Sequence, residues 1–199
     1  YAYAVRGEDA YINLFLNNEA SLQTDNGELL LAQHTRYPWE GSVELIIHNE
    51  KAVKATLNIR VPGWALNSPV PSDLFRFVDE QESEPVLKVN GKEVKLTLEK
   101  GYAVLEGHWK RGDHITLEMT MEDRILVANE KVNAKSGLMA VQYGPLVYCG
   151  EELDNEIDVL EAGINTDSKF EVCYRPAILD GVNVLKGEEL TLIPYYAWA

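Results

Sequence analysis

The sequence predicts an all-β protein built from two antiparallel β-sandwich domains of the jelly-roll-like kind. Three observations support this prediction. Alternating apolar and polar residues recur along the chain, short polar turns separate the alternating stretches, and no window of ten residues or more holds a helical period. Many short strands joined by tight turns are typical of sandwiches in a chain of 199 residues.

The strands are expected wherever the alternation is sustained. The clearest is 53–60, where apolar residues at the odd positions alternate with polar residues at the even positions. Residues 115–121 repeat this pattern, which indicates a strand with one buried face. Further strands are expected at 11–16, 28–34, 43–48, 94–98, 102–106, 124–128, 139–149 and 190–193.

Glycine-containing dipeptides mark the turns between these strands. Asn-Gly occurs at 26–27 and 90–91, and Gly-Asp occurs at 112–113. Asn and Gly accept the positive φ angles that two-residue hairpin turns require. These positions are therefore expected to join neighbouring antiparallel strands.

One connection is too long for a plain hairpin. Residues 63–85 are rich in proline and acidic side chains, and such long loops often carry a function or cover another part of the fold. The alternation weakens again near Met121. We therefore expect one sandwich over 1–121 and a second over 122–199.

Composition excludes two classes of partner. The net charge is −14, with 32 acidic against 18 basic residues, and no cluster of Lys and Arg could neutralise a row of phosphates. Nucleic acid is not an expected partner. The apolar runs are far too short to cross a bilayer, so a membrane is not expected either.

The two cysteines do not suggest a metal site. Cys149 and Cys173 lie 24 positions apart, each between apolar, strand-like residues, with no neighbouring His or Cys. Buried free thiols are expected rather than a disulfide. The chain opens at Tyr1 without a basic or apolar leader, which we interpret as a piece of a longer protein whose targeting signal lies outside it.

The stretch QHTRYPWEGSV, residues 33–43, looks most like functional chemistry and has two interpretations. In the first, Tyr37, Trp39 and Trp64 stack on sugar rings while Glu40 and Arg36 bind hydroxyl groups, since aromatic faces with polar neighbours recognise carbohydrates. In the second, the aromatic rings pack beneath a turn. We favour packing, here and for Trp109, because burial is the common fate of aromatic residues in sandwich cores.

Six blocks of sequence carry a family resemblance. In order they are YAVRGEDAYINLFLNNEA, TRYPWEGSV, IRVPGWALNSPVPSDLF, GYAVLEGHWKRGDHITLEM, GPLVYCGEELDN and IPYYAWA. Together they resemble the C-terminal part of the β-L-arabinofuranosidase family of glycoside hydrolases, family 127, over nearly the whole chain. The chain looks like a bacterial member, of the kind that Bacteroidetes use on plant glycans.

The resemblance implies that the active site lies elsewhere. Family members are similar to a helical (α/α) barrel followed by two β-sandwiches, and the barrel carries a nucleophilic cysteine, its zinc-binding cysteine and glutamate partners, and an acid/base glutamate. The nucleophile belongs to a Cys-Cys-Pro stretch that this chain lacks, and Cys149 matches the accessory block GPLVYC. The resemblance therefore implies no catalytic residue, metal ligand or cofactor here, with zinc in the missing catalytic domain.

The expected function follows from this division. The chain would be a non-catalytic accessory portion of a glycoside hydrolase that packs on the barrel and supports it. The alternative is a carbohydrate-binding module that holds a plant-derived oligosaccharide at Tyr37, Trp39, Glu40 and Trp64. The parent protein would be periplasmic or secreted, and a surface that packs on the barrel should appear as an exposed apolar patch.

Overall fold

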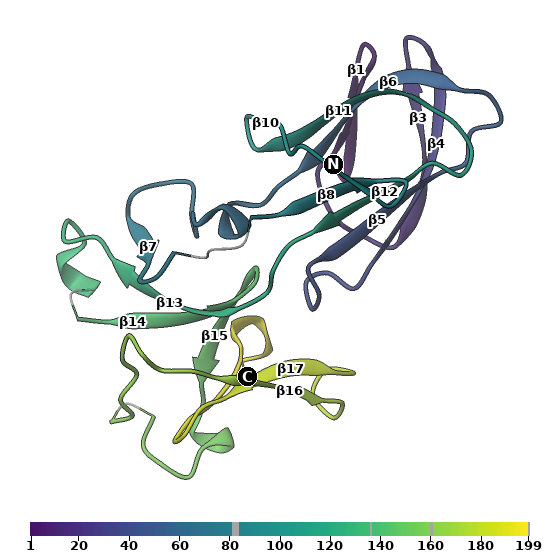
Figure 1. The fold of residues 1–199 in the computed structure, drawn as a ribbon. Helices are drawn as coiled ribbons and strands as arrows, with labels where there is room; N and C mark the ends of the chain where they lie inside the picture. Colours follow the sequence, from purple (N-terminus) through teal and green to yellow (C-terminus); the bar gives the residue numbers. More distant parts are fainter. Residues whose placement is uncertain (81–83, 136, 160, 199) are drawn as a thin grey trace. The chain divides into compact units, whose positions relative to one another are not determined.

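The protein is described by a computed structural model, which covers residues 1–80, 84–135, 137–159 and 161–198. The predicted all-β class is confirmed, because these residues form eighteen strands and four short 3-10 helices and no α-helix (Figure 1). They divide into two compact units, 1–66 with 84–120 and 67–80 with 121–198. The division expected from the sequence placed both 67–80 and Met121 with the first unit, whereas the structure places them with the second.

Two sheets build the first unit. One has five strands in the order β1 (Tyr3–Arg6), β2 (Asp9–Ile12), β6 (Val53–Arg60), β11 (Tyr102–Trp109) and β10 (Leu98–Glu99). The other has six strands in the order β3 (Asn18–Thr24), β4 (Gly27–Thr35), β5 (Ser42–Ile47), β12 (His114–Glu118), β8 (Val86–Val89) and β9 (Lys92–Val94).

The alternation seen in the sequence sets which face of each sheet is buried. The apolar residues of β6 at 53, 55, 57 and 59 are all buried, as are Ile115 and Leu117 of β12. Most neighbouring strands are antiparallel, as predicted, but β2 pairs with β6 in parallel. Such a pair needs a long crossover between its strands, and here β3, β4 and β5 lie between them in the sequence.

Two of the three predicted turns, at 26–27 and 90–91, join paired antiparallel strands in the first unit. Asn90 and Gly91 join β8 to β9 with φ angles of 52° and 75°, which is the pair of left-handed residues that a two-residue hairpin needs. Gly112, with φ 86°, lies in a turn between β11 and β12, but these strands belong to different sheets, so the hairpin expected at 112–113 is wrong. The local turn chemistry at 90–91 therefore fixes the register of β8 against β9.

The second unit is built on a single hydrogen-bonded sheet. Its core consists of apolar residues of the sheet packed against side chains of the connection after β15, including Val159, Ile164 and Phe170. A connecting segment thus takes the place that a second sheet has in a sandwich. The seven strands run in the order β16 (Glu171–Arg175), β17 (Val182–Lys186), β18 (Thr191–Pro194), β15 (Leu146–Gly150), β14 (Met139–Tyr143), β13 (Asp123–Ala128) and β7 (Phe75–Phe77).

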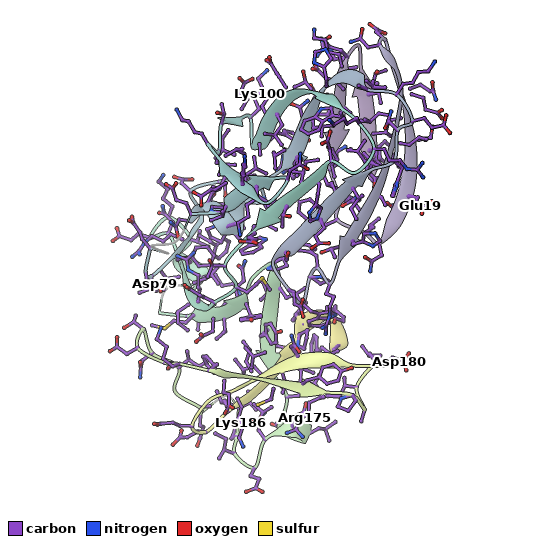
Figure 2. The ribbon with its side chains drawn as sticks, turned by 45° about the vertical axis from the view of Figure 1, so that its right-hand side comes forward. Glu19, Asp79, Lys100, Arg175, Asp180 and Lys186 are labelled. Carbon is purple, nitrogen blue, oxygen red and sulfur yellow. The ribbon has the colours of Figure 1, made fainter. Side chains whose placement is uncertain are left out.

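The long connection expected at 63–85 contributes a strand to this sheet. It begins with a 3-10 helix, Gly63–Leu66, and then forms β7, which pairs with β13. Arg124 of β13 holds the end of β7: its guanidinium carbon lies 3.6 Å from the centroid of the Phe77 ring. Its Nη2 donates to the Asp79 carbonyl oxygen at 2.5 Å; Asp79 is labelled in Figure 2.

Tyr148 makes the second unit less stable at alkaline pH. Its ring is buried in the core, its hydroxyl donates to the Asn183 carbonyl oxygen at 3.0 Å, and burial raises its pKa well above the ordinary value of about 10. A pKa raised by folding gives stability that is complete below the unfolded pKa and is lost as the pH rises above it.

We therefore expect the urea-unfolding free energy to fall as the pH rises from about 10 to 11.5. Tyr148→Phe should lower stability at neutral pH, because the Asn183 carbonyl loses its donor, and should make the alkaline slope smaller by up to ~1.4 kcal/mol per pH unit. Parallel pH profiles for the two proteins would contradict this prediction.

Candidate functional site

The motif at 33–43 forms the connection between β4 and β5. Thr35, the last residue of β4, closes this connection through its hydroxyl group. Its Oγ1 accepts a hydrogen bond from the Tyr37 backbone N–H at 3.0 Å and donates one to the Ser42 carbonyl oxygen at 2.7 Å. The peptide bond between Tyr37 and Pro38 is cis. The Thr35 hydroxyl therefore ties the two ends of the loop 36–41 together.

Charged side chains lie on the outside of this loop. The backbone N–H groups of Trp39 and Glu40 both donate to the Arg36 carbonyl oxygen, at 2.8 and 3.2 Å. The Arg36 Nη1 lies 2.9 Å from the Glu40 Oε1, and these side chains are 75% and 51% exposed. An ion pair this exposed contributes little to stability, which leaves both groups open to a partner.

The Tyr37 ring packs into the first unit. It meets the edge of Phe15 at a centroid distance of 5.3 Å and an interplanar angle of 80°. Its hydroxyl accepts a hydrogen bond from Trp64 Nε1 at 3.3 Å, and burial raises the pKa of Tyr37. The ring therefore supports the loop from below, as the packing interpretation expects.

The four residues proposed for carbohydrate binding are not arranged as one exposed platform. Trp64 is only 7% exposed, so neither of its faces is open to a sugar ring. Tyr37 and Trp39 are half-buried, and Glu40 is exposed beside Arg36. The structure thus brings Tyr37 and Trp64 together as a packed pair and leaves Trp39 and Glu40 nearer the surface.

A second segment, residues 13–17, lies beside this loop. The sequence had predicted a strand over 11–16 and did not indicate this segment as part of a site. β2 ends at Ile12, and 13–17 is a connection to β3 in which Leu14 and Leu16 are exposed on either side of the buried Phe15. The Asn17 Oδ1 accepts a hydrogen bond from the Thr35 backbone N–H at 2.7 Å. The run LFL between asparagines, without alternation, was the available signal.

The cysteines are free thiols, as predicted, but both are half-buried rather than buried. Cys149 pairs with Ile193, and Cys173 pairs with Val184, in one row across the sheet of the second unit. Three strand spacings separate the two cysteines, about 14 Å, which is too far for a disulfide. Burial raises the pKa of Cys149, as do the carboxylates of Glu151 and Asp154, so this thiol stays protonated at neutral pH.

Metal-binding side chains do not gather within the described residues, where no group of three His, Cys, Asp or Glu is placed to hold an ion. A separate finding concerns membranes. No helix in the part of the chain that the structure covers is long and apolar enough to span a bilayer.

The fold and a comparison with known protein families together define the class of this chain. They place its two all-β units among the accessory regions of glycoside hydrolases. The middle-domain model of the β-L-arabinofuranosidases of family GH127 matches residues 9–121. The C-terminal domain model of glycoside hydrolase family 127 matches residues 123–199. The chain belongs to glycoside hydrolase family 127, which confirms the resemblance seen in the sequence.

Relatives with known names and structures agree with this assignment. A non-reducing end β-L-arabinofuranosidase of Bifidobacterium longum is 27% identical over all of this chain and 32% of its own length. A solved GH127 β-arabinofuranosidase is 37% identical with a TM-score of 0.93, and the match covers 100% of this chain and 34% of that one. A GH127 β-L-arabinofuranosidase from Geobacillus stearothermophilus T6 is 28% identical with a TM-score of 0.85, over 100% and 33% of the two chains.

The chain therefore spans about a third of the length of the relatives that it matches. The part of the family protein that this chain matches consists of the middle and C-terminal domains.

Proposed function

We propose that the chain is the accessory all-β portion of a longer β-L-arabinofuranosidase-like glycoside hydrolase. In this proposal, catalysis takes place on an N-terminal (α/α) barrel, and the two β units pack on that barrel and support it. One observation carries the proposal: the family models that match are those of the middle and C-terminal domains, and the relatives are about three times as long as this chain.

The position of the metal belongs to the same proposal. Zinc would be bound on the barrel, where it would hold and activate a cysteine nucleophile. The described residues of this chain do not fit such a site, because they hold no group of three ligating side chains and their cysteines lie three strands apart. No catalytic step is assigned to this chain.

Carbohydrate binding is the second candidate function. The exposed Glu40 and Arg36 beside the half-buried Trp39 are the observation that favours it, because charged groups next to an indole can bind sugar hydroxyls. The burial of Trp64 removes one of the expected stacking rings. This candidate therefore rests on fewer residues than the accessory role.

The accessory role is tested by comparing two proteins: this chain, and the longer protein that includes the N-terminal domain. Both are assayed with zinc and a chromogenic β-L-arabinofuranoside. We expect activity in the longer protein alone. Activity of the 199-residue chain would overturn the accessory assignment, and a longer protein inactive on this substrate would overturn the proposed activity.

A further inference from the structure

Exposed apolar side chains gather around the first residues of the chain, beside the loop 36–41. Tyr1 is fully exposed, and Leu14 and Leu16 are 52% and 48% exposed. We call Tyr1, Leu14, Leu16 and the loop 36–41 the N-terminal patch. Among the described residues of the first unit, the remaining exposed large apolar side chains are Val5 and Leu98, on the short strands β1 and β10.

Hydrogen bonds connect the parts of this patch to one another. The Asn13 Nδ2 donates to the Tyr1 carbonyl oxygen at 3.1 Å, and the Leu14 N–H donates to the Ala2 carbonyl oxygen at 3.3 Å. On the other side, Asn17 holds the start of the loop through the Thr35 N–H. The segment 13–17 is thus fixed between the first residues and the loop.

Packing beneath the patch fixes its outward-facing side chains. Phe15 is buried and meets Tyr37, which in turn bonds to Trp64. Because the middle residue of the LFL run points inward, its two leucines are held outward on a supported segment. A rigid apolar centre beside the exposed Arg36–Glu40 pair has the composition of a protein interface, with an apolar core and a polar rim.

We propose that the N-terminal patch is the surface on which the N-terminal domain of the longer family protein packs. This inference rests on the proposed function, namely that the chain is part of a longer glycoside hydrolase. In the family, the matched regions are the middle and C-terminal domains, so the remaining domain lies on the Tyr1 side.

The position of Tyr1 favours the N-terminal domain as the partner of this surface. Its carbonyl oxygen is held inside the patch by Asn13, so any preceding residue is bonded to the chain at the patch itself. A domain tethered this closely has a local concentration of the order of millimolar or more, which favours contact with the nearest apolar surface. Contact there would cover Leu14 and Leu16, whose exposure is otherwise unfavourable.

Hydrogen exchange tests this surface directly. Backbone amides of 13–17 and 36–41 should exchange at least about tenfold more slowly in the longer protein than in the 199-residue chain. Amides of 95–100, which include the exposed Leu98, should exchange equally in both. Equal exchange of the patch amides in the two proteins would overturn the inference.

A pair of variants tests the energetic role of the leucines. Leu14→Ser combined with Leu16→Ser should leave the thermal midpoint of the 199-residue chain within roughly 2 °C, since both side chains are exposed. In the longer protein, the same double variant should lower the midpoint by at least about 4 °C and abolish the slower exchange of the patch.

Leu98→Ser is the matched control, because Leu98 is 40% exposed in the same unit but outside the patch. It should change neither the midpoint nor the exchange in either protein. A double variant that behaves like this control in the longer protein would overturn the inference. The proposed function fails by a different result, the absence of arabinofuranosidase activity in the unmodified longer protein.

Discussion

Trp109→Ala should lower the unfolding free energy of the first unit by roughly 3–5 kcal/mol, the usual cost of deleting a large buried aromatic side chain. The indole is 5% exposed at the end of β11, and its Nε1 donates to the Ala55 carbonyl oxygen at 2.9 Å. The substitution would open a cavity and remove the hydrogen bond from the indole to the Ala55 carbonyl, and the two costs add. Gly107 contributes to the fit, since a Cβ there would lie 3.0 Å from the ring.

Urea unfolding followed by circular dichroism measures this loss. Trp198→Ala is a suitable control, because Trp198 is 61% exposed and its removal leaves no buried cavity. The control should change the unfolding free energy by less than about 1 kcal/mol. A loss below about 1 kcal/mol for Trp109→Ala would mean that the ring is not part of the core.

Periodicity predicted the fold wherever burial alternates along a single strand. The strand β6 is the clearest case, because its inward residues from Val53 to Ile59 are buried as expected. The turn at Asn90 and Gly91 was predicted equally well, because its conformation depends on the types of these two residues alone. Periodicity failed to mark the turn inside 139–149, where Gly144 adopts φ 52° and separates β14 from β15.

Elements defined by distant partners could not be predicted. β7 has three residues, too few to show a period, and it exists because β13, nearly fifty positions later, pairs with it. β16 is exposed along most of its length, so its burial does not alternate. The parallel pairing of β2 with β6 likewise depends on topology, which a single sequence does not specify.

The candidate site shows the same limit. The sequence predicted that Tyr37 and Trp64 pack in the first unit rather than bind sugar, but it gave no sign that their polar atoms meet. It also extended a strand over 11–16, because apolar residues continue past Ile12. The exposure of Leu14 and Leu16 is visible only once Phe15 is seen to pack on Tyr37.

Arg124→Ala should release the 67–80 segment from the second unit. The Arg124 side chain is 4% exposed, and it lies between the Phe77 ring and Asp79. Burial lowers the pKa of Arg124, against the opposite effect of Asp79 and Glu122, but a guanidinium stays charged at neutral pH. Its removal therefore breaks both a cation–π contact and a charge-assisted hydrogen bond.

The size of this effect follows from the two interactions. The cation–π contact contributes about 0.5–2 kcal/mol and a hydrogen bond from a charged donor about 1.5–3 kcal/mol, so that we expect a loss of about 2–5 kcal/mol. Arg124→Met should lose less, because a methionine can still pack on Phe77. Urea unfolding and limited proteolysis within 67–80 would measure both effects.

Arg175→Ala supplies the comparison, since Arg175 is an exposed arginine of the same unit, labelled in Figure 2. It should leave both stability and proteolysis of 67–80 unchanged. If Arg124→Ala also left that segment resistant to protease, pairing of β7 with β13 would suffice to hold it. If protease cleaves residues 67–80 in Arg124→Ala but not in Arg175→Ala, then the Arg124 guanidinium is required to hold this segment on the sheet of the second unit.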